Sequence, residues 1–255
     1  GCCSSFWKLI RQEPSHVGVV FERGRSKARL AIDPAYKATR DLKPAPADLK
    51  SQFPLVRRAA EAFGFTCVEV PDVEADDVIA TYTRIAREVG RDVTIHSSDK
   101  DFAQLVSENV SMFDPLKKRK LGPEESLLKF GVPPEQMIDF LAMTGDTSDN
   151  IVGIKNIGPK KAAALLSRFG SLEAILQNAD EITQIVMRDD IKRDGWKAAI
   201  AKTLVILDQH VAVDVPDIDI FSYSGFDRAK AIAFLEEMEL VTLREEINEE
   251  MKEAA

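Results

Sequence analysis

Short apolar runs that fit β-strands alternate with stretches of helical periodicity through the first half of the chain, and this alternation restricts the possible folds more than any other feature. The predicted strands are residues 16–22, 65–70 and 92–96. Strands separated by helices are typical of a mainly parallel sheet with helices on its faces. We therefore expect an α/β fold.

Two helices are predicted between these strands. Their apolar residues recur at helical spacing: Val56, Ala60 and Phe63 in the first helix, and Val78, Tyr82, Ile85 and Val89 in the second. Gly64 and Gly90 follow directly and are placed to end them. The polar, proline-containing segment between the first two strands, residues 22–50, is too long for an ordinary connection, so we expect a functional or disordered loop there.

The second half of the chain changes in character from Gly122 onward. It contains short helical stretches with a proline near the start (Pro123, Pro134 and Pro159) and a glycine near the end (Gly131, Gly145 and Gly170). We place a boundary near Gly145, with an α/β core in residues 1–144, including the loop region at about 23–50, and a helical module in residues 145–255.

Acidic residues recur where the predicted strands end. Glu22 closes the first strand, a group at 74–77 follows the second, and a group at 97–101 follows the third, at the edge where open α/β sheets place their sites. A further pair lies three residues apart in the segment 145–150. The full set is Glu22, Glu74, Asp76, Asp77, Asp99, Asp101, Asp146 and Asp149.

Carboxylates packed together repel one another, and a hard divalent cation would relieve that repulsion. Helix capping explains one or two of these acids but not the whole set. Because no histidine or cysteine joins them, the ligand set favours Mg²⁺ or Mn²⁺ and disfavours zinc. The sequence therefore predicts a metal site made only of oxygen ligands.

The overall charge argues against nucleic acid as a partner, but its distribution does not. The chain carries 34 basic and 42 acidic residues, a net charge of −8. Without the eight acids above, the two signs balance. Residues 23–43 hold seven basic residues against two acids, and residues 117–120 form a second basic run that could equally be a solvated face.

Residues 153–166 form a second strong pattern, in which a glycine-bearing hairpin directly precedes a helix. Gly153 and Gly158 frame the turn, and Lys160 and Lys161 follow it. Free backbone N–H groups at a helix start bind phosphate without selecting a base sequence. We expect this hairpin to hold nucleic acid independently of sequence.

These motifs, in this order, resemble those of the 5′-nuclease superfamily that includes flap endonucleases, and most closely the amino-terminal nuclease domain of bacterial DNA polymerases I. The resemblance covers nearly the whole chain. The segments that carry it are residues 19–22, 34–40, 74–77, 98–101 and 145–150 and the hairpin at Gly158.

The resemblance implies a PIN-like nuclease core, a helix-hairpin-helix module and two-metal cleavage of DNA phosphodiesters at 5′ flaps, nicks or ends. The first ion would be held by Glu22, Glu74 and Asp76. The second would be held or tuned by Asp99, Asp101, Asp146 and Asp149. Asp77 would contact these ligands rather than bind an ion directly. On the arch, Lys37 and Arg40 would neutralise the scissile phosphate, while Arg29 and Tyr36 would steer the displaced strand. Lys37, Arg40, Glu74, Asp76 and Asp99 are the predicted catalytic residues. Gly153, Gly158, Lys160 and Lys161 would anchor the duplex, with K⁺ nearby.

Three departures from the family pattern bear on activity. The family's first strand, which delivers a metal-binding aspartate, has no counterpart here; position 22 is Glu where relatives carry Asp; and Ala28 stands where they carry Phe. We expect a fragment with weak or no turnover. One alternative is a DNA-binding module of the same family that has lost catalysis. Another is a related ribonuclease or toxin-like nuclease, which the hairpin disfavours.

The remaining expectations concern location and partners. With 45% hydrophobic residues and no apolar run long enough for a membrane span, we expect a soluble protein without a membrane partner. Cys2, Cys3 and Cys67 form no C-x-x-C pair, which fits a reducing cytoplasm, and association with the nucleoid if the source is bacterial. A covalently linked polymerase domain would fit the family.

Overall fold

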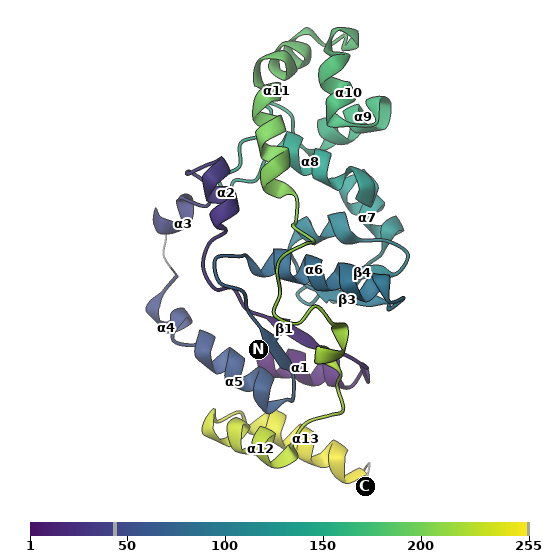
Figure 1. Cartoon of the computed structure of the whole chain (residues 1–255). Coiled ribbons are helices and arrows are strands. Elements are labelled where there is room, and N and C mark those ends of the chain that lie inside the picture. The colour runs from purple at the N-terminus through teal and green to yellow at the C-terminus, as the bar shows by residue number, and fades with distance from the viewer. Residues whose placement is uncertain (43–44, 254–255) are drawn as a thin grey trace. The chain divides into compact units, whose positions relative to one another are not determined.

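A computed structural model of the chain describes residues 1–42 and 45–253. It divides into two compact units, each built from segments that are distant in the sequence (Figure 1). The terminal unit comprises Gly1–Arg23, Ala45–Val70 and Val213–Ala255, and the central unit comprises Gly24–Pro44 and Pro71–Ala212. Each is described by itself. The predicted boundary near Gly145 stays a prediction.

The terminal unit has a small parallel sheet with helices around it. Its elements are α1 (Cys2–Ile10), β1 (Gly18–Val20), α4 (Ala47–Lys50), α5 (Phe53–Ala62), β2 (Thr66–Val68), η4 (Ile218–Phe221), α12 (Arg228–Glu237) and α13 (Val241–Glu253). Strands β1 and β2 pair in parallel, as predicted. Trp7, Phe63 and Leu235 are buried at the centre of an apolar cluster that holds this unit together.

The central unit has three strands: β3 (Val93–His96), β4 (Val110–Asp114) and β5 (Arg119–Leu121). Strand β3 pairs with β4 in parallel, whereas β4 pairs with β5 antiparallel. The expectation of one mainly parallel sheet is therefore correct only in part, since the described residues form two small sheets and the second is mixed. The cause lies in the turn, where the Asp114 carboxylate accepts hydrogen bonds from the amides of Leu116 (3.0 Å) and Lys117 (3.1 Å). A turn this short can join only antiparallel strands.

Helices dominate the rest of the central unit. They are α2 (Lys27–Ile32), α3 (Thr39–Leu42), α6 (Ala75–Glu88), η1 (Lys100–Leu105), α7 (Pro123–Phe130), η2 (Pro134–Gln136), α8 (Met137–Thr144), α9 (Pro159–Phe169), α10 (Leu172–Gln177), η3 (Ala179–Glu181) and α11 (Ile185–Val205). The predicted prolines begin α7, η2 and α9. Gly131, Gly145 and Gly170 follow α7, α8 and α9 with positive φ angles, as the sequence predicted.

One local prediction was wrong in part. The segment 22–50 is not a structureless loop, because its described residues include α2, α3 and α4. That the segment is functional stays a prediction. The Ser26 side chain caps α2 by accepting a hydrogen bond from the Arg29 amide, which explains why a helix starts there. Val89, the last residue of the apolar spacing predicted for α6, is 59% exposed, and the helix ends at Glu88 with Val89 as its C-cap.

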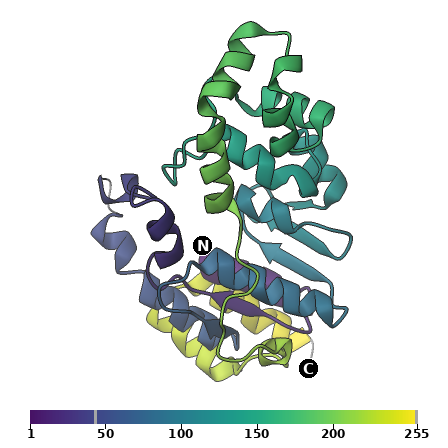
Figure 2. The ribbon, with the colours of Figure 1, turned by 45° about the horizontal axis from the view of Figure 1, so that its top comes forward.

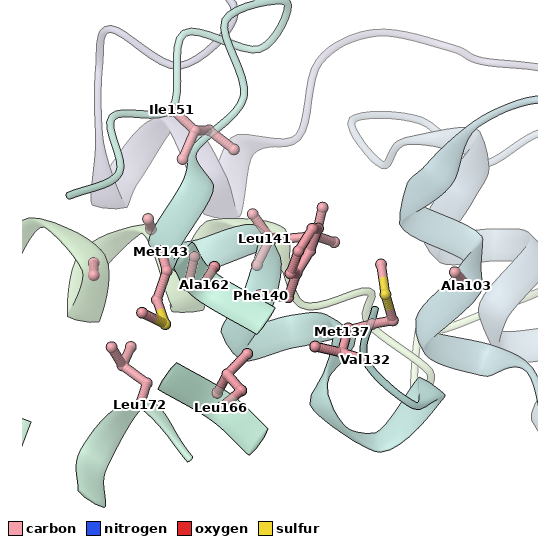
Figure 3. Packing of buried hydrophobic residues seen from close by; sticks show 14 of the residues in the cluster. Ala103, Val132, Met137, Phe140, Leu141, Met143, Ile151, Ala162, Leu166 and Leu172 are labelled. Atoms are coloured by element: carbon pink, nitrogen blue, oxygen red, sulfur yellow. The ribbon is translucent and has the colours of Figure 1, made fainter. Parts of the chain in front are cut away.

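Helix α8 is the centre of the central unit's core. Met137, Leu141 and Met143 are each at most 1% exposed, and they pack with Leu166 of α9 and Leu172 of α10 in the same apolar cluster (Figure 3). The long helix α11 lies against α8 in both views (Figures 1 and 2). This packing holds the helices on either side of the hairpin in fixed positions. No helix in the described part of the chain is long and apolar enough to cross a membrane.

Candidate functional site

The predicted acids of the central unit lie at the starts of helices and in one turn. Glu74 is the N-cap of α6, and Asp76 and Asp77 lie in the first turn of that helix. Asp99 caps η1 directly after β3, with its side chain accepting a hydrogen bond from the Asp101 amide (3.0 Å). These positions follow strand ends, as the sequence predicted.

Asp146 and Asp149 lie in a turn that follows α8. The sequence left open whether they begin a helix; they do not, because the Asp146 and Ile151 backbones exchange two hydrogen bonds (2.9 and 2.7 Å) that close the turn. Asn150 has a φ of 58° in this turn, and its side-chain amide donates to the Ala35 carbonyl (2.7 Å). The turn is thereby attached to the segment that precedes α3.

Lys37 connects two of these acids. Its ammonium lies 2.6 Å from a Glu74 oxygen and 3.5 Å from an Asp149 oxygen, and the Lys37 side chain is only 4% exposed. The Tyr36 hydroxyl also donates to Glu74 (2.9 Å), and Arg40 pairs with the other Asp149 oxygen (2.8 Å). The residues 34–40 and the acids at 74 and 149, far apart in the sequence, therefore meet.

Arg29 was predicted to steer a displaced DNA strand, and that role stays a prediction. Its guanidinium is buried, pairs with both oxygens of Asp77 (2.5 and 2.8 Å), and donates to Glu74 (3.0 Å). Tyr36 is also buried, at 3% exposed, and its predicted part in steering the strand likewise stays a prediction. Burial and the charge of Glu74 raise the pKa of the Tyr36 hydroxyl, which keeps it a neutral donor. Both side chains donate a hydrogen bond to the Glu74 carboxylate.

Asp146 is compensated by a different cation. It forms a short ion pair with Lys100 and accepts hydrogen bonds from the amide (2.7 Å) and hydroxyl of Ser148. Burial alone would raise the pKa of Asp146, but the hydrogen bonds from Lys100 and Ser148 outweigh burial and lower that pKa to about 2. Asp146 is therefore ionised at any physiological pH.

Asp76, Asp99 and Asp101 form no salt bridge with any side chain that the structure describes. Burial, followed by the negative charge of Asp99, raises the pKa of Asp76 to about 7 and the pKa of Asp101 to about 7. Asp101 Oδ1 is buried without a hydrogen-bond partner. An orphaned oxygen of a carboxylate whose pKa is raised by burial and by the charge of a neighbouring acid is chemically suited to a hard divalent cation.

As arranged, however, the acids are not a finished metal site. No three of the described acidic, histidine or cysteine side chains lie close enough to hold an ion together. Glu22 is an exposed side chain of the terminal unit, and its predicted metal-binding role stays a prediction.

The hairpin between α8 and α9 depends on close backbone approach. A Cβ atom added at Gly153 would lie 2.4 Å from the Met143 carbonyl oxygen and 2.6 Å from the Gly145 amide nitrogen, so only glycine fits. Gly158 is the N-cap of α9, with open space where a side chain would begin. Lys160 and Lys161 are exposed in the first turn of α9, as predicted.

Sequence reasoning missed three side chains around these features. Asp190 and Asp194 of α11 are buried against the hairpin, and Gln104 of η1 bonds to the segment after α11. An acidic pair four residues apart on a helix usually faces solvent, so only the apolar surroundings of α11 could have drawn attention to it.

The chain matches two protein-family models along most of its length. Residues 1–131 match the family described as "5′-3′ exonuclease, N-terminal resolvase-like domain", and residues 132–229 match "5′-3′ exonuclease, C-terminal SAM fold". The chain belongs to the 5′-3′ exonuclease family. The predicted family and class of enzyme are thus confirmed.

The relatives of this exonuclease chain include DNA polymerases I. It is 42% identical to the DNA polymerase I of Rhizobium leguminosarum, over 98% of this chain and 25% of that protein. It is 36% identical to the thermostable DNA polymerase I of Thermus thermophilus, over 96% of this chain and 29% of that protein. The chain thus spans between a quarter and a third of the length of these curated relatives.

Among solved structures, the exonuclease chain resembles nucleases of bacteriophage T5. It matches a D15 flap endonuclease in complex with DNA and metal ions with a TM-score of 0.73 and 23% identity, over 92% of this chain and 89% of that one. It matches a D15 protein crystallised with metal ions with a TM-score of 0.69 and 25% identity, over 81% of each chain. The flap endonuclease fold, with helices in its C-terminal part, is therefore shown.

Proposed function

We propose that the chain is a structure-specific 5′-3′ exonuclease and flap endonuclease that hydrolyses DNA phosphodiesters with two divalent cations. The observation that carries the proposal is that Asp76, Asp99 and Asp101 form no salt bridge with a described basic side chain and that Asp101 Oδ1 is buried without a hydrogen-bond partner. The family supports the same activity, and metal ions and DNA are bound by the T5 relatives.

In this proposal, Asp76, Asp99 and Asp101 would hold Mg²⁺ or Mn²⁺ together with Glu74, Asp146 and Asp149, whereas the metal-binding role of Glu22 stays a prediction. Such cations would activate a water molecule and stabilise the leaving oxygen. Arg29, which pairs with both oxygens of Asp77, fixes the orientation of Glu74 through its own hydrogen bond to that carboxylate.

Lys37 and Arg40 contribute positive charge for the scissile phosphate. Both contact Asp149, so their positive charges lie beside an acid of the candidate site. Gly153 and Gly158 allow the hairpin backbone to approach a duplex, and Lys160 and Lys161 add charge beside it. A K⁺ ion at the hairpin and a linked polymerase domain remain predictions.

A second candidate is a DNA-holding module without catalysis. It is favoured by the pairing of Glu74, Asp146 and Asp149 with Lys37, Lys100 and Arg40, because these pairs neutralise acids that a cation would otherwise use. The altered residue at position 22 points in the same direction.

One experiment separates the two candidates. A 5′-labelled flap duplex is incubated with the chain in Mg²⁺ or EDTA, and binding is followed by fluorescence anisotropy. Cleavage that requires Mg²⁺ and is lost in Asp101→Asn, but not in the exposed control Asp92→Asn, supports the nuclease. Retained flap affinity without product in any buffer supports the binding module, and absence of both rejects the proposal.

A further inference from the structure

Asp190 and Asp194 attach α11 to the hairpin. One Asp194 oxygen accepts hydrogen bonds from the Lys155 amide (3.3 Å) and Arg193 (2.6 Å), and the other accepts from Lys197 (2.9 Å). Asp190 accepts from the Asn156 side-chain amide (2.8 Å). Both carboxylates are nearly inaccessible to solvent, at 4% and 3% exposed, although their helix lies at the protein surface. Two buried acids therefore fix the hairpin loop that precedes Gly158.

The segment that follows α11 is attached to the acid-bearing elements. Gln104 of η1 donates to the Val205 carbonyl (3.0 Å) and accepts from the Leu207 amide (3.0 Å). The same Gln104 amide nitrogen donates to the Asp101 carbonyl (2.9 Å). One side chain thus connects the segment directly to the acid whose oxygen is orphaned.

Residues beside the acids hold the same segment from α2 and α6. Arg29 donates to the carbonyls of Leu204 and Ile206, both at 2.8 Å, and Asp77 accepts from the Asp208 amide (2.9 Å). Arg29 also donates to the Glu74 carboxylate and to both oxygens of Asp77. The segment 204–208 is thereby fixed by three elements of the candidate site.

Between these two attachments, α11 is a rigid element of constant length. It is an uninterrupted helix of 21 residues, and the part from Asp194 to Leu204 corresponds to roughly 15 Å. Ile191, Ala198 and Ala201 are at most 1% exposed where α11 packs in the core shared with α8 (Figure 2). A hydrogen-bonded helix that is packed in a core keeps a nearly constant length.

We propose that α11 sets the spacing between the hairpin and the carboxylates, and so determines which phosphodiester is cut relative to the duplex end. Asp194 is the positioning residue at the hairpin end, and Gln104 is the positioning residue at the acid end. The proposal rests on the proposed function, because it needs a chain that holds a duplex at the hairpin and cleaves at the acids. It adds that the distance between the two is held by one helix.

The test measures the position of the cut. A flap duplex with a fluorescent 5′ end is cleaved in Mg²⁺ by the wild-type chain and by Asp194→Ala, Gln104→Leu and the control Asp189→Ala, and products are separated at single-nucleotide resolution. Asp189 is exposed and lies beside Asp190 on the same helix. Wild type and the control are expected to give one dominant product, whereas both positioning variants spread cleavage over neighbouring phosphodiesters.

Affinity for a blunt duplex distinguishes the variant at the hairpin attachment of α11 from the variant at its acid-end attachment. Asp194→Ala is expected to weaken binding of a blunt duplex about tenfold, the effect of losing a hydrogen bond to a charged group. Gln104→Leu leaves duplex affinity unchanged, because the hairpin keeps its attachment. Variants that cut more slowly but at the same single phosphodiester as wild type would overturn the proposal, since a merely structural role predicts that result.

A second readout needs no cleavage. Hydrogen exchange at the Leu207 and Asp208 amides is measured in EDTA with and without blunt duplex DNA. Duplex should slow exchange there in wild type and Asp189→Ala but not in Asp194→Ala, and equal slowing in all three contradicts the proposal. A wild-type chain that neither binds duplex nor cuts would reject the proposed function, whereas unchanged cut positions in a chain that does both would reject only the role of α11.

Discussion

The Lys37 ammonium lies 2.6 Å from the Glu74 carboxylate, and each side chain is at most 4% exposed. A buried ion pair is stable only while both partners are present, because each desolvated charge depends on the other. In this structure the Lys37 ammonium therefore supplies the positive charge beside Glu74 that a metal ion would otherwise supply. A divalent ion that binds there has to replace that positive charge.

Lys37→Met tests this pairing without substrate. In EDTA, the loss of the ammonium leaves the buried Glu74 carboxylate without its nearest cation, so we expect the free energy of unfolding to fall by about 3 kcal/mol. Urea denaturation measures it. Mg²⁺ should recover part of the loss in the variant and much less in wild type. Lys50→Met, at an exposed lysine, is the control, and equal stability of the two variants in EDTA would contradict the pairing.

The crowded acids predict an unusual pH dependence of stability. Because burial and Asp99 raise the pKa of Asp101 to about 7, from 3.8, the folded chain binds a proton between these values that the unfolded chain has released. This group therefore stabilises the fold at low pH, and the contribution is lost as pH rises through 7. Asp101→Asn removes the charge, so we expect it to raise Tm over wild type at pH 8 in EDTA.

The gain from Asp101→Asn should shrink as pH falls from 8 to 5.5, because the wild-type carboxyl is then protonated and neutral. Thermal denaturation at several pH values in EDTA measures the difference. The control Asp92→Asn replaces an exposed aspartate before β3 and should show no such trend. A pH-independent difference for Asp101→Asn would show that the carboxylate is not crowded.

The sequence was sufficient to predict that acids follow the strand ends, but not what neutralises them. Glu74, Asp99 and Asp101 follow strand ends, and position in an α/β fold follows from the order of strands and helices. The partners Lys37, Arg29 and Lys100 could not be assigned, because contacts between distant segments depend on packing that no local pattern encodes.

Other elements escaped prediction for local reasons. Strand β5 turned back because one carboxylate, Asp114, caps a short turn, and a single aspartate in a loop is too common to signal this. Asp190 and Asp194 would ordinarily be assigned to a solvated helix face. Their burial depends on the hairpin packed over them, which is a tertiary feature.

The same substitution to alanine should change the stability of the chain at one glycine of the hairpin and not at the other. Gly153→Ala places a methyl group 2.4 Å from the Met143 carbonyl oxygen, so the backbone must shift, and we expect a loss of about 1–3 kcal/mol in unfolding free energy. Gly158→Ala meets nothing within 4 Å and should leave stability almost unchanged.

If the Gly158 backbone approaches a phosphate, Gly158→Ala should nevertheless weaken duplex binding, because the added methyl group occupies the surface where the strand would lie. Anisotropy with a blunt duplex measures affinity, and urea denaturation measures stability. Full duplex affinity in a stable Gly158→Ala chain would place the DNA contact elsewhere.

Arg29 offers the sharpest test of how the acids are supported. All five N–H groups of its guanidinium are used, two on Asp77, one on Glu74, and two on the carbonyls of Leu204 and Ile206. Lysine keeps the charge but has three donors and no planar fork, so it cannot satisfy these acceptors together.

We therefore expect Arg29→Lys to lose about 2–4 kcal/mol in unfolding free energy, whereas Arg168→Lys, in an ion pair whose arginine is 52% exposed, changes it by less than about 0.5 kcal/mol. Because Glu74 loses its fixed orientation, calorimetry should also show weaker Mn²⁺ binding to Arg29→Lys than to Arg168→Lys. If Arg29 instead contacted a DNA strand, the lysine variant would keep wild-type stability and Mn²⁺ affinity and would lose only affinity for the flap.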